Sequence, residues 1–213
     1  MKPAEETLRI DGPAGVIETL VDQPAQPRGI ALIGHPHPLF GGTATNKVAH
    51  TLARTFVQLD YVALRPNFRG VGHSSGVHDH GIGESDDLLA VVAAAKARYG
   101  DLPLALAGFS FGAYVQTRLA ERLSELGQPA QRLVLVGLAT GAIAGGDRQY
   151  TARPVPRDSL IIHGAADTTV PLANVLAWAE AQDLPVTLIA GADHFFHRRL
   201  HLIRDIVLQA WRH

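Results

Sequence analysis

Three residues in this chain could together form an activated nucleophile, and they occur in the order serine, aspartate, histidine. Ser110 lies in the stretch G-F-S-F-G, Asp167 in H-G-A-A-D and His194 in G-A-D-H. A serine hydroxyl is a poor nucleophile at neutral pH, so a base must accept its proton. An imidazole can do so when a carboxylate fixes its tautomer and stabilises the imidazolium that forms. Alone, Asp167 would be interpreted as a turn residue and His194 as a polar residue at a helix start, but together they predict acyl transfer through an acyl-serine.

The residues around Ser110 predict a sharp turn from a strand into a helix. An apolar run of strand length precedes the turn, and an amphipathic helical pattern follows it. Such a strand–turn–helix context exposes the serine of G-x-S-x-G above the edge of a sheet. Gly108 and Gly112 flank the serine because strand and helix cross there too closely for a Cβ atom. The N–H of Phe111, the first residue of the helix, would then point at an oxyanion beside Ser110.

Composition narrows the class of protein. With 213 residues, of which 46% are apolar, residues 1–213 are expected to form one domain with a sizeable core. The 19 basic and 20 acidic residues nearly cancel, so neither nucleic acid nor a membrane surface is an expected partner. The absence of cysteine excludes disulfides, thiolate catalysis and cysteine-ligated metals. With neither a signal-like segment nor an apolar span, the chain is expected to be cytoplasmic.

Predicted strands and helices alternate along the chain. This alternation predicts an α/β fold with a doubly wound, mostly parallel sheet and helices on both faces. In such sheets ligands bind beyond the carboxyl ends of the strands, where Ser110, Asp167 and His194 would meet. The strands are expected at 7–13, 16–22, 29–34, 61–64, 104–108, 133–138, 160–163 and 186–190, and the helices at 45–59, 84–99, 111–127, 172–182 and 196–211.

Several of these stretches carry a resemblance to a known superfamily. The set HPHPLFGG, NFRGVGHSSG, GFSFGA, HGAADTTVP and GADHFF resembles the α/β-hydrolases over residues 29–200. More narrowly, it is similar to small bacterial serine hydrolases akin to dienelactone hydrolases and to acyl-peptidase catalytic domains. The resemblance implies an eight-stranded sheet with one antiparallel strand near its start. One departure is the nucleophile, since dienelactone hydrolases have cysteine where this chain has Ser110.

A second departure concerns the oxyanion hole. Many relatives carry His-Gly-Gly or His-Gly-x after the corresponding strand, whereas this chain has H-P-H-P at 35–38. Proline has no N–H to donate. The main-chain N–H of His37 is therefore the expected partner of Phe111 in the oxyanion hole, with that of Leu39 as the alternative.

The segment 139–158 is too short and too rich in glycine and proline for a helical cap. It leaves room for one short helix at most, so a fold without a cap domain and with an open cleft is expected. Such a cleft favours short acyl groups, because little apolar wall is available to bury each added methylene. The acyl pocket is expected to be shaped by Leu39, Phe40, Phe109, Phe111 and Phe195.

Other polar motifs point to no cofactor or metal. The pair His35 and His37 has no further His or acidic residue at a recognisable ligand spacing. The glycines of Gly70-Val71-Gly72 do not complete a dinucleotide-binding pattern. Arg69 is expected to pair with Glu84 or Asp87 as a structural tie.

The sequence thus predicts a serine hydrolase that acts on a small-molecule carboxylic ester with a short acyl group. Thioesters and small amides or peptides remain alternatives, because an acyl-enzyme does not identify the leaving group. A non-catalytic binding module on the same fold is the alternative of another class, and the oligomeric state is left open.

Overall fold

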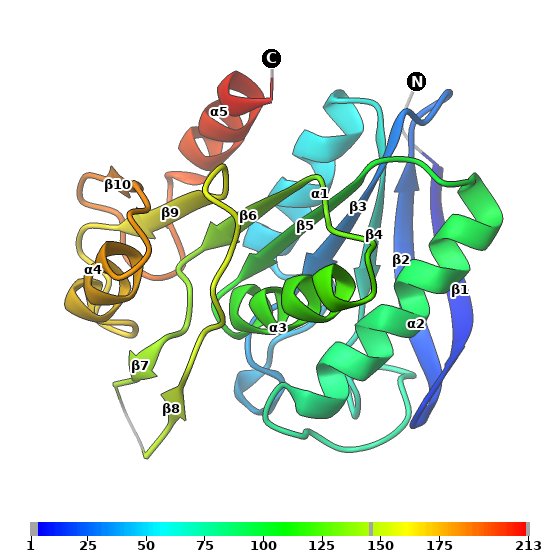
Figure 1. Cartoon of the computed structure of the whole chain (residues 1–213), viewed down its shortest axis with the longest axis horizontal. Helices are drawn as coiled ribbons and strands as arrows, with labels where there is room; N and C mark the ends of the chain where they lie inside the picture. Colours follow the sequence, from blue (N-terminus) through cyan, green and yellow to red (C-terminus); the bar gives the residue numbers. More distant parts are fainter. Residues whose placement is uncertain (1–3, 145–146, 212–213) are drawn as a thin grey trace.

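A central sheet of eight strands organises the protein, in the order β1-β2-β4-β3-β5-β6-β9-β10 (Figure 1). The structure is a computed structural model that describes residues 4–144 and 147–211. Strand β2 is antiparallel to both of its neighbours and the remaining pairs are parallel, which confirms the expected fold and its one antiparallel strand. The strands are β1 Ala4–Gly12, β2 Gly15–Gln23, β3 Gly29–Gly34, β4 Tyr61–Pro66, β5 Leu104–Phe109, β6 Arg132–Val136, β9 Leu160–Gly164 and β10 Val186–Ile189.

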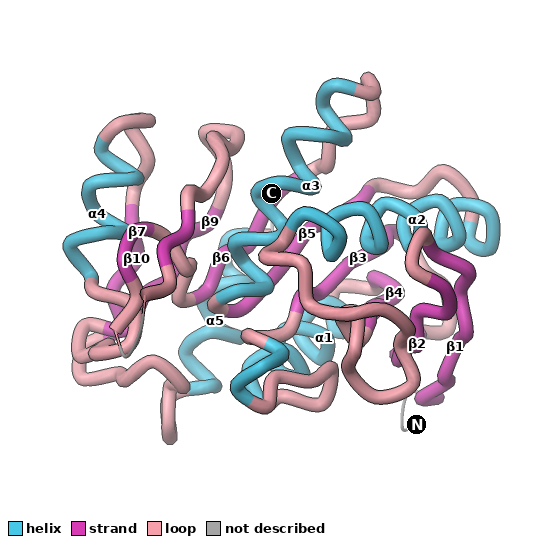
Figure 2. Tube along the Cα trace, turned by 90° about the horizontal axis from the view of Figure 1, so that it is seen from below, coloured by secondary structure: helices cyan, strands magenta, loops and turns pink. Residues whose placement is uncertain are grey.

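Helices cover both faces of this sheet. Helices α2 and α3 pack on one face, while α1 and α5 pack on the other (Figure 2). The sheet therefore separates two apolar cores, one containing Leu88 and Val115 and the other containing Phe56 and Val207. Strands between two cores are buried on both sides, which explains their continuous apolar runs. The helices are α1 Lys47–Gln58, α2 Ile82–Tyr99, α3 Phe111–Glu125, α4 Leu172–Glu180 and α5 Leu200–Ala210.

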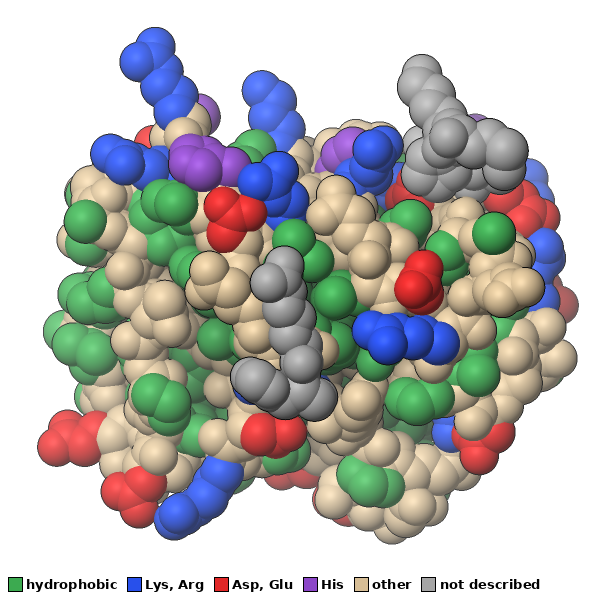
Figure 3. All heavy atoms as spheres, turned by 90° about the horizontal axis from the view of Figure 1, so that it is seen from above, with side chains coloured by type: hydrophobic (Ala, Val, Ile, Leu, Met, Phe, Trp, Pro, Cys, Tyr) green, Lys and Arg blue, Asp and Glu red, His purple; other side chains and the backbone are tan. Residues whose placement is uncertain are grey.

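The outer surface is mixed in character. Basic, acidic and hydrophobic side chains are interspersed on the face drawn in Figure 3, in keeping with the nearly balanced charge of the sequence. In the part of the chain that the structure describes, no helix is long and apolar enough to cross a membrane.

The last helix differs from its prediction. It begins at Leu200 rather than Phe196, because Phe196 and Arg198 have φ values of 53° and 61°, which an α-helix cannot contain. His197 consequently lies in a turn before the helix, where its Nδ1 is 2.6 Å from the Asp193 Oδ2. The apolar periodicity continues into this turn because Phe196 is fully buried.

The segment that could have carried a cap is a short hairpin. Strands β7 (Gly141–Ala142) and β8 (Gln149–Tyr150) pair with each other outside the main sheet. The Asn174 side chain of α4 donates to Ala142 O at 2.8 Å, and Ala144 N donates to Thr169 O at 3.0 Å. Within the described residues of 139–158 there is no helix, so the fold has no cap domain.

The turn from β5 into α3 depends on close contact between main chains. A Cβ atom on Gly112 would lie 2.3 Å from the Gly34 oxygen and 2.5 Å from the His35 oxygen. A Cβ on Gly108 would lie 2.5 Å from the carbonyl carbon of Gly112. The expected steric reason for the two glycines is therefore confirmed, and it ties the helix start to the end of β3.

We expect Gly112→Ala to lower the free energy of unfolding by more than about 3 kcal/mol, because backbone atoms on both sides must move. Urea unfolding followed by circular dichroism measures this loss. The control is Gly127→Ala, where φ is 71° but nothing lies within 4 Å of the added Cβ. It should cost only the roughly 1–2 kcal/mol of left-handed strain. Equal losses in the two variants would contradict the steric explanation.

Candidate active site

Ser110 occupies a strained backbone position at the turn between β5 and α3. Its φ of 55° and ψ of −117° lie outside the regions that side-chain-bearing residues favour. Neighbouring main chain holds this conformation: Ser110 N donates to Val136 O at 2.9 Å, and Ser110 O accepts from Tyr114 N at 3.1 Å. The serine is thereby presented at the carboxyl end of the sheet.

Two hydrogen bonds join the three predicted residues into one chain. His194 Nδ1 donates to Asp167 Oδ2 at 2.7 Å, and His194 Nε2 lies 3.0 Å from Ser110 Oγ. With its proton on Nδ1, the ring leaves Nε2 free to accept the serine proton. The residues come from the loops after β5, β9 and β10, which meet at the carboxyl ends of these parallel strands (Figure 1).

The Asp167 carboxylate is held by more than the histidine. Its Oδ1 accepts from Thr169 N at 2.8 Å and Val170 N at 2.9 Å, and its side chain is fully buried. Burial by itself would raise the pKa of Asp167, but the bond from His194 and the main-chain N–H donors outweigh it and lower that pKa. The carboxylate therefore stays ionised and keeps its orientation.

A buried histidine that the sequence analysis did not single out lies beside this carboxylate. His163 Nε2 is 3.1 Å from Val170 O and 3.6 Å from Asp167 Oδ2. Burial lowers the pKa of His163, so it stays neutral. Without a charge, His163 does not compete with His194 for an ion pair with the Asp167 carboxylate. From the sequence, His163 could be assigned only to the end of the strand that precedes Asp167.

The loop from His35 to Gly42 lines the same cavity as Ser110. The rings of His37 and Phe111 are 4.9 Å apart, so the two residues adjoin. Leu39 N donates to His37 Nδ1 at 3.2 Å. This bond occupies the Leu39 N–H, the alternative to the His37 N–H as an oxyanion donor. Within residues 4–144 and 147–211, the main-chain N–H groups of His37 and Phe111 donate to no protein acceptor. Both are therefore available to an oxygen near Ser110.

His35 anchors this loop. Its Nδ1 donates to Pro36 O at 2.6 Å, and its Nε2 accepts from Phe68 N at 2.9 Å. These bonds require a neutral ring, and full burial lowers the pKa of His35 to about 4. His35 thus joins the loop after β3 to the loop after β4.

The His37 ring is packed against a group of aromatic and charged side chains that includes His78 and Glu84. The His37 ring packs against the His78 ring at a tilt of 41° with centroids 4.7 Å apart, and His78 Nδ1 lies 3.0 Å from the buried Glu84 carboxylate. Burial first, and then the charges of His78 and Arg148, lower the pKa of His37 to about 4. A neutral His37 keeps Nδ1 free to accept the Leu39 N–H.

Arg69 lies near the carboxylates of Glu84 and Asp87. It forms two hydrogen bonds to Asp87, at 2.7 and 2.8 Å, so its structural tie is to Asp87 rather than to Glu84.

A cavity of about 240 Å³ opens above Ser110. The structure does not place all the predicted pocket residues in its wall. Leu39 is 69% exposed and lies outside the wall, while Phe109 is fully buried against the His194 ring. Phe111 is buried as well. The wall consists of Pro36, His37, Phe40, Gly41, Gly42, Asn46, Ser110, Arg148, Thr169, His194 and Phe195.

Comparison with known proteins gives the family. No protein-family model matches the chain. An α/β serine hydrolase without a lid from Xanthomonas campestris is 36% identical, with a TM-score of 0.83 over 98% of this chain and 94% of its own. An α/β serine hydrolase homologue from Coxiella burnetii is 33% identical, with a TM-score of 0.80 over 99% of this chain and 98% of its own. This chain belongs to the α/β serine hydrolases.

An uncharacterised protein of Rickettsia prowazekii is a further relative, 33% identical over 89% of this chain and 81% of its own. The absence of a cap domain fits the description of the Xanthomonas structure as lidless. In this α/β serine hydrolase a serine hydroxyl, an imidazole and two main-chain N–H groups without protein acceptors among the described residues lie around one small cavity. That set of groups can carry out acyl transfer.

The two histidines of the H-P-H-P stretch both make hydrogen bonds to the protein. His35 is bonded to Pro36 and Phe68, and His37 accepts from Leu39. Among the described residues, no three His, Asp or Glu side chains gather closely enough to hold a metal ion.

The neutral state of His35 makes stability depend on pH. Its pKa is about 4 in the folded protein against 6.5 for the ordinary group. Between these values the unfolded chain binds a proton that the folded chain does not, so the free energy of unfolding falls as pH falls. We expect His35 to contribute roughly 3 kcal/mol to this loss.

Urea unfolding across this pH window, repeated for His35→Gln, measures the contribution. The variant should be less stable at neutral pH but should lose less stability on acidification. His201→Gln, which removes an exposed imidazole, controls for the loss of a histidine as such. An unchanged slope in His35→Gln would contradict the assignment.

Proposed function

We propose that this α/β serine hydrolase cleaves carboxylic esters of small acyl groups through an acyl-enzyme on Ser110. The observation that carries the proposal is the hydrogen-bonded chain from Ser110 through His194 to Asp167, of which Ser110 and His194 line a cavity of about 240 Å³.

In the proposed reaction His194 accepts the proton of Ser110 as the serine oxygen attacks the ester carbonyl. The N–H groups of Phe111 and His37 donate to the oxyanion that forms, and the amino end of α3 adds its dipole. His194 then gives the proton to the departing alkoxide. Water, activated by the same imidazole, attacks the acyl-serine and releases the acid.

Three features support a small acyl group. The cavity is smaller than the roughly 300–1,000 Å³ typical of sites for drug-sized ligands. No α-helix of the described residues covers it, and its aromatic wall, Phe40 and Phe195, is 65% and 49% exposed. An acyl chain longer than the cavity would extend into solvent, so additional methylenes would gain little from burial.

A fluorophosphonate probe should label one residue, Ser110, and Asp167→Asn should lower kcat for p-nitrophenyl acetate by roughly 10³- to 10⁴-fold. The asparagine amide would favour the wrong tautomer of His194. Asp193→Asn is the matched control, since Asp193 is exposed and bonded to His197, and should cost far less. Intact-mass and peptide analysis identify the labelled residue.

A folded wild-type protein that is not labelled would favour a non-catalytic binding module. A larger loss for Asp193→Asn than for Asp167→Asn would show that the acidic residue is wrongly assigned.

Across p-nitrophenyl esters from acetate to decanoate, we expect kcat/KM to be flat or to fall beyond medium chains. Each methylene contributes about 0.8 kcal/mol only where it is buried. The rate should also show no jump when a substrate passes its solubility limit, because there is no lid to open. A steep rise on emulsions of long-chain esters would contradict this part of the proposal.

A further inference from the structure

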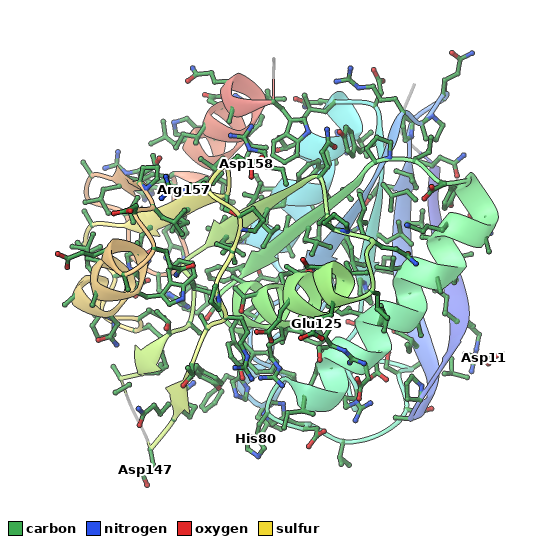
Figure 4. The ribbon with its side chains drawn as sticks, viewed as in Figure 1. Asp11, His80, Glu125, Asp147, Arg157 and Asp158 are labelled. Carbon is green, nitrogen blue, oxygen red and sulfur yellow. The ribbon has the colours of Figure 1, made fainter. Side chains whose placement is uncertain are left out.

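One arginine lies in the wall of the cavity that contains Ser110. The Arg148 guanidinium carbon is 4.1 Å from the centre of the Phe40 ring, and its Nη2 donates to Ala144 O at 3.0 Å. The Arg148 main chain is held too, because its carbonyl accepts from Ile143 N at 2.9 Å. Arg148 enters the cavity from the β7–β8 hairpin, next to Asp147 at the hairpin end in Figure 4. The side chain is therefore positioned toward the cavity and not extended into solvent.

Arg148 has no protein counter-ion in the part of the chain that the structure describes. No carboxylate oxygen there lies within 4.0 Å of its guanidinium, and its Nε is buried without a hydrogen-bond partner. Among the described residues that line the cavity, it is also the one with a permanent charge. A half-buried guanidinium without an anion is costly, since it loses water and gains no opposite charge in return. The cavity thus offers a single positive charge and a planar fork of donors, which match one carboxylate.

We propose that Arg148 binds a carboxylate on the acyl half of the substrate, so that the preferred substrate is the half-ester of a small dicarboxylic acid. We assign the carboxylate to the acyl half because Arg148 packs on Phe40. Phe40 belongs to the same loop as the His37 N–H, which would bind the oxygen of the acyl carbonyl. His194, which would protonate the leaving alcohol, lies on a different loop. This inference rests on the ester hydrolysis proposed above. Water cleaves the acyl–oxygen bond of the half-ester and gives the dicarboxylate and the free alcohol.

The test uses two esters that differ in one group: monomethyl glutarate and its neutral isostere, in which a carboxamide replaces the free carboxylate. Product formation by each is quantified by chromatography for wild type, Arg148→Gln and Arg148→Lys. We expect wild type to prefer the carboxylate ester by roughly 10- to 100-fold in kcat/KM, the range for a charge-assisted hydrogen-bond pair. Arg148→Gln should remove most of this preference, and Arg148→Lys should keep part of it.

Arg157→Gln is the control, because Arg157 is 82% exposed and precedes β9 at the amino end of the sheet (Figure 4). It should keep the wild-type preference. Equal rates for the two esters in wild type, or an equal loss for both in Arg148→Gln, would overturn the role of Arg148 while ester hydrolysis stands. If wild type hydrolyses neither ester nor p-nitrophenyl acetate and Ser110 is not labelled, the proposed function itself is wrong, and this inference with it.

Discussion

The contact between the main chains of Gly34 and Gly112 is the constraint on which the rest of the site depends. It brings the end of β3 against the first turn of α3, and so places the loop after β3 beside Ser110. The strained φ and ψ of Ser110 are tolerated because β6 and α3 hydrogen-bond its main chain on both sides. A serine on an ordinary turn would not adjoin both a helix amino end and the N–H groups of another loop.

Three buried, neutral histidines act as hydrogen-bonding groups that hold the loops around the site. His35, His37 and His163 each use a ring nitrogen as a hydrogen-bonding group to main chain, and burial lowers the pKa of all three. An imidazole that stays uncharged can hold a loop without adding charge beside Ser110. The chain is rich in histidine, with 11 such residues, yet these three are explained by packing and hydrogen bonding without any ligand.

Much of the fold and of the hydrogen-bonded chain could be predicted from sequence because these features leave local patterns. Strands that lie between two apolar cores have continuous apolar sequences. Ser110 can be recognised by the two flanking glycines, because no Cβ atom fits at those positions. The cavity wall could not be predicted in the same way. Phe109 was expected there because it neighbours Ser110, but side chains alternate along a strand, and its own side points into the core behind His194. Arg148 has no periodic pattern around it, so only the three-dimensional arrangement links it to Ser110.

The β7–β8 hairpin forms a sheet of its own and shares no ladder with the eight central strands. Its length can therefore change without shifting the register of any core strand. The residues that position Ser110 belong to the central sheet and its loops, whereas the hairpin supplies Arg148 from outside that framework. On the proposed role of Arg148, the hairpin carries the group that selects the substrate, whereas the central sheet and its loops hold Ser110, His194 and Asp167. Exchanging this hairpin for another would then change the side chain that faces the cavity without moving Ser110.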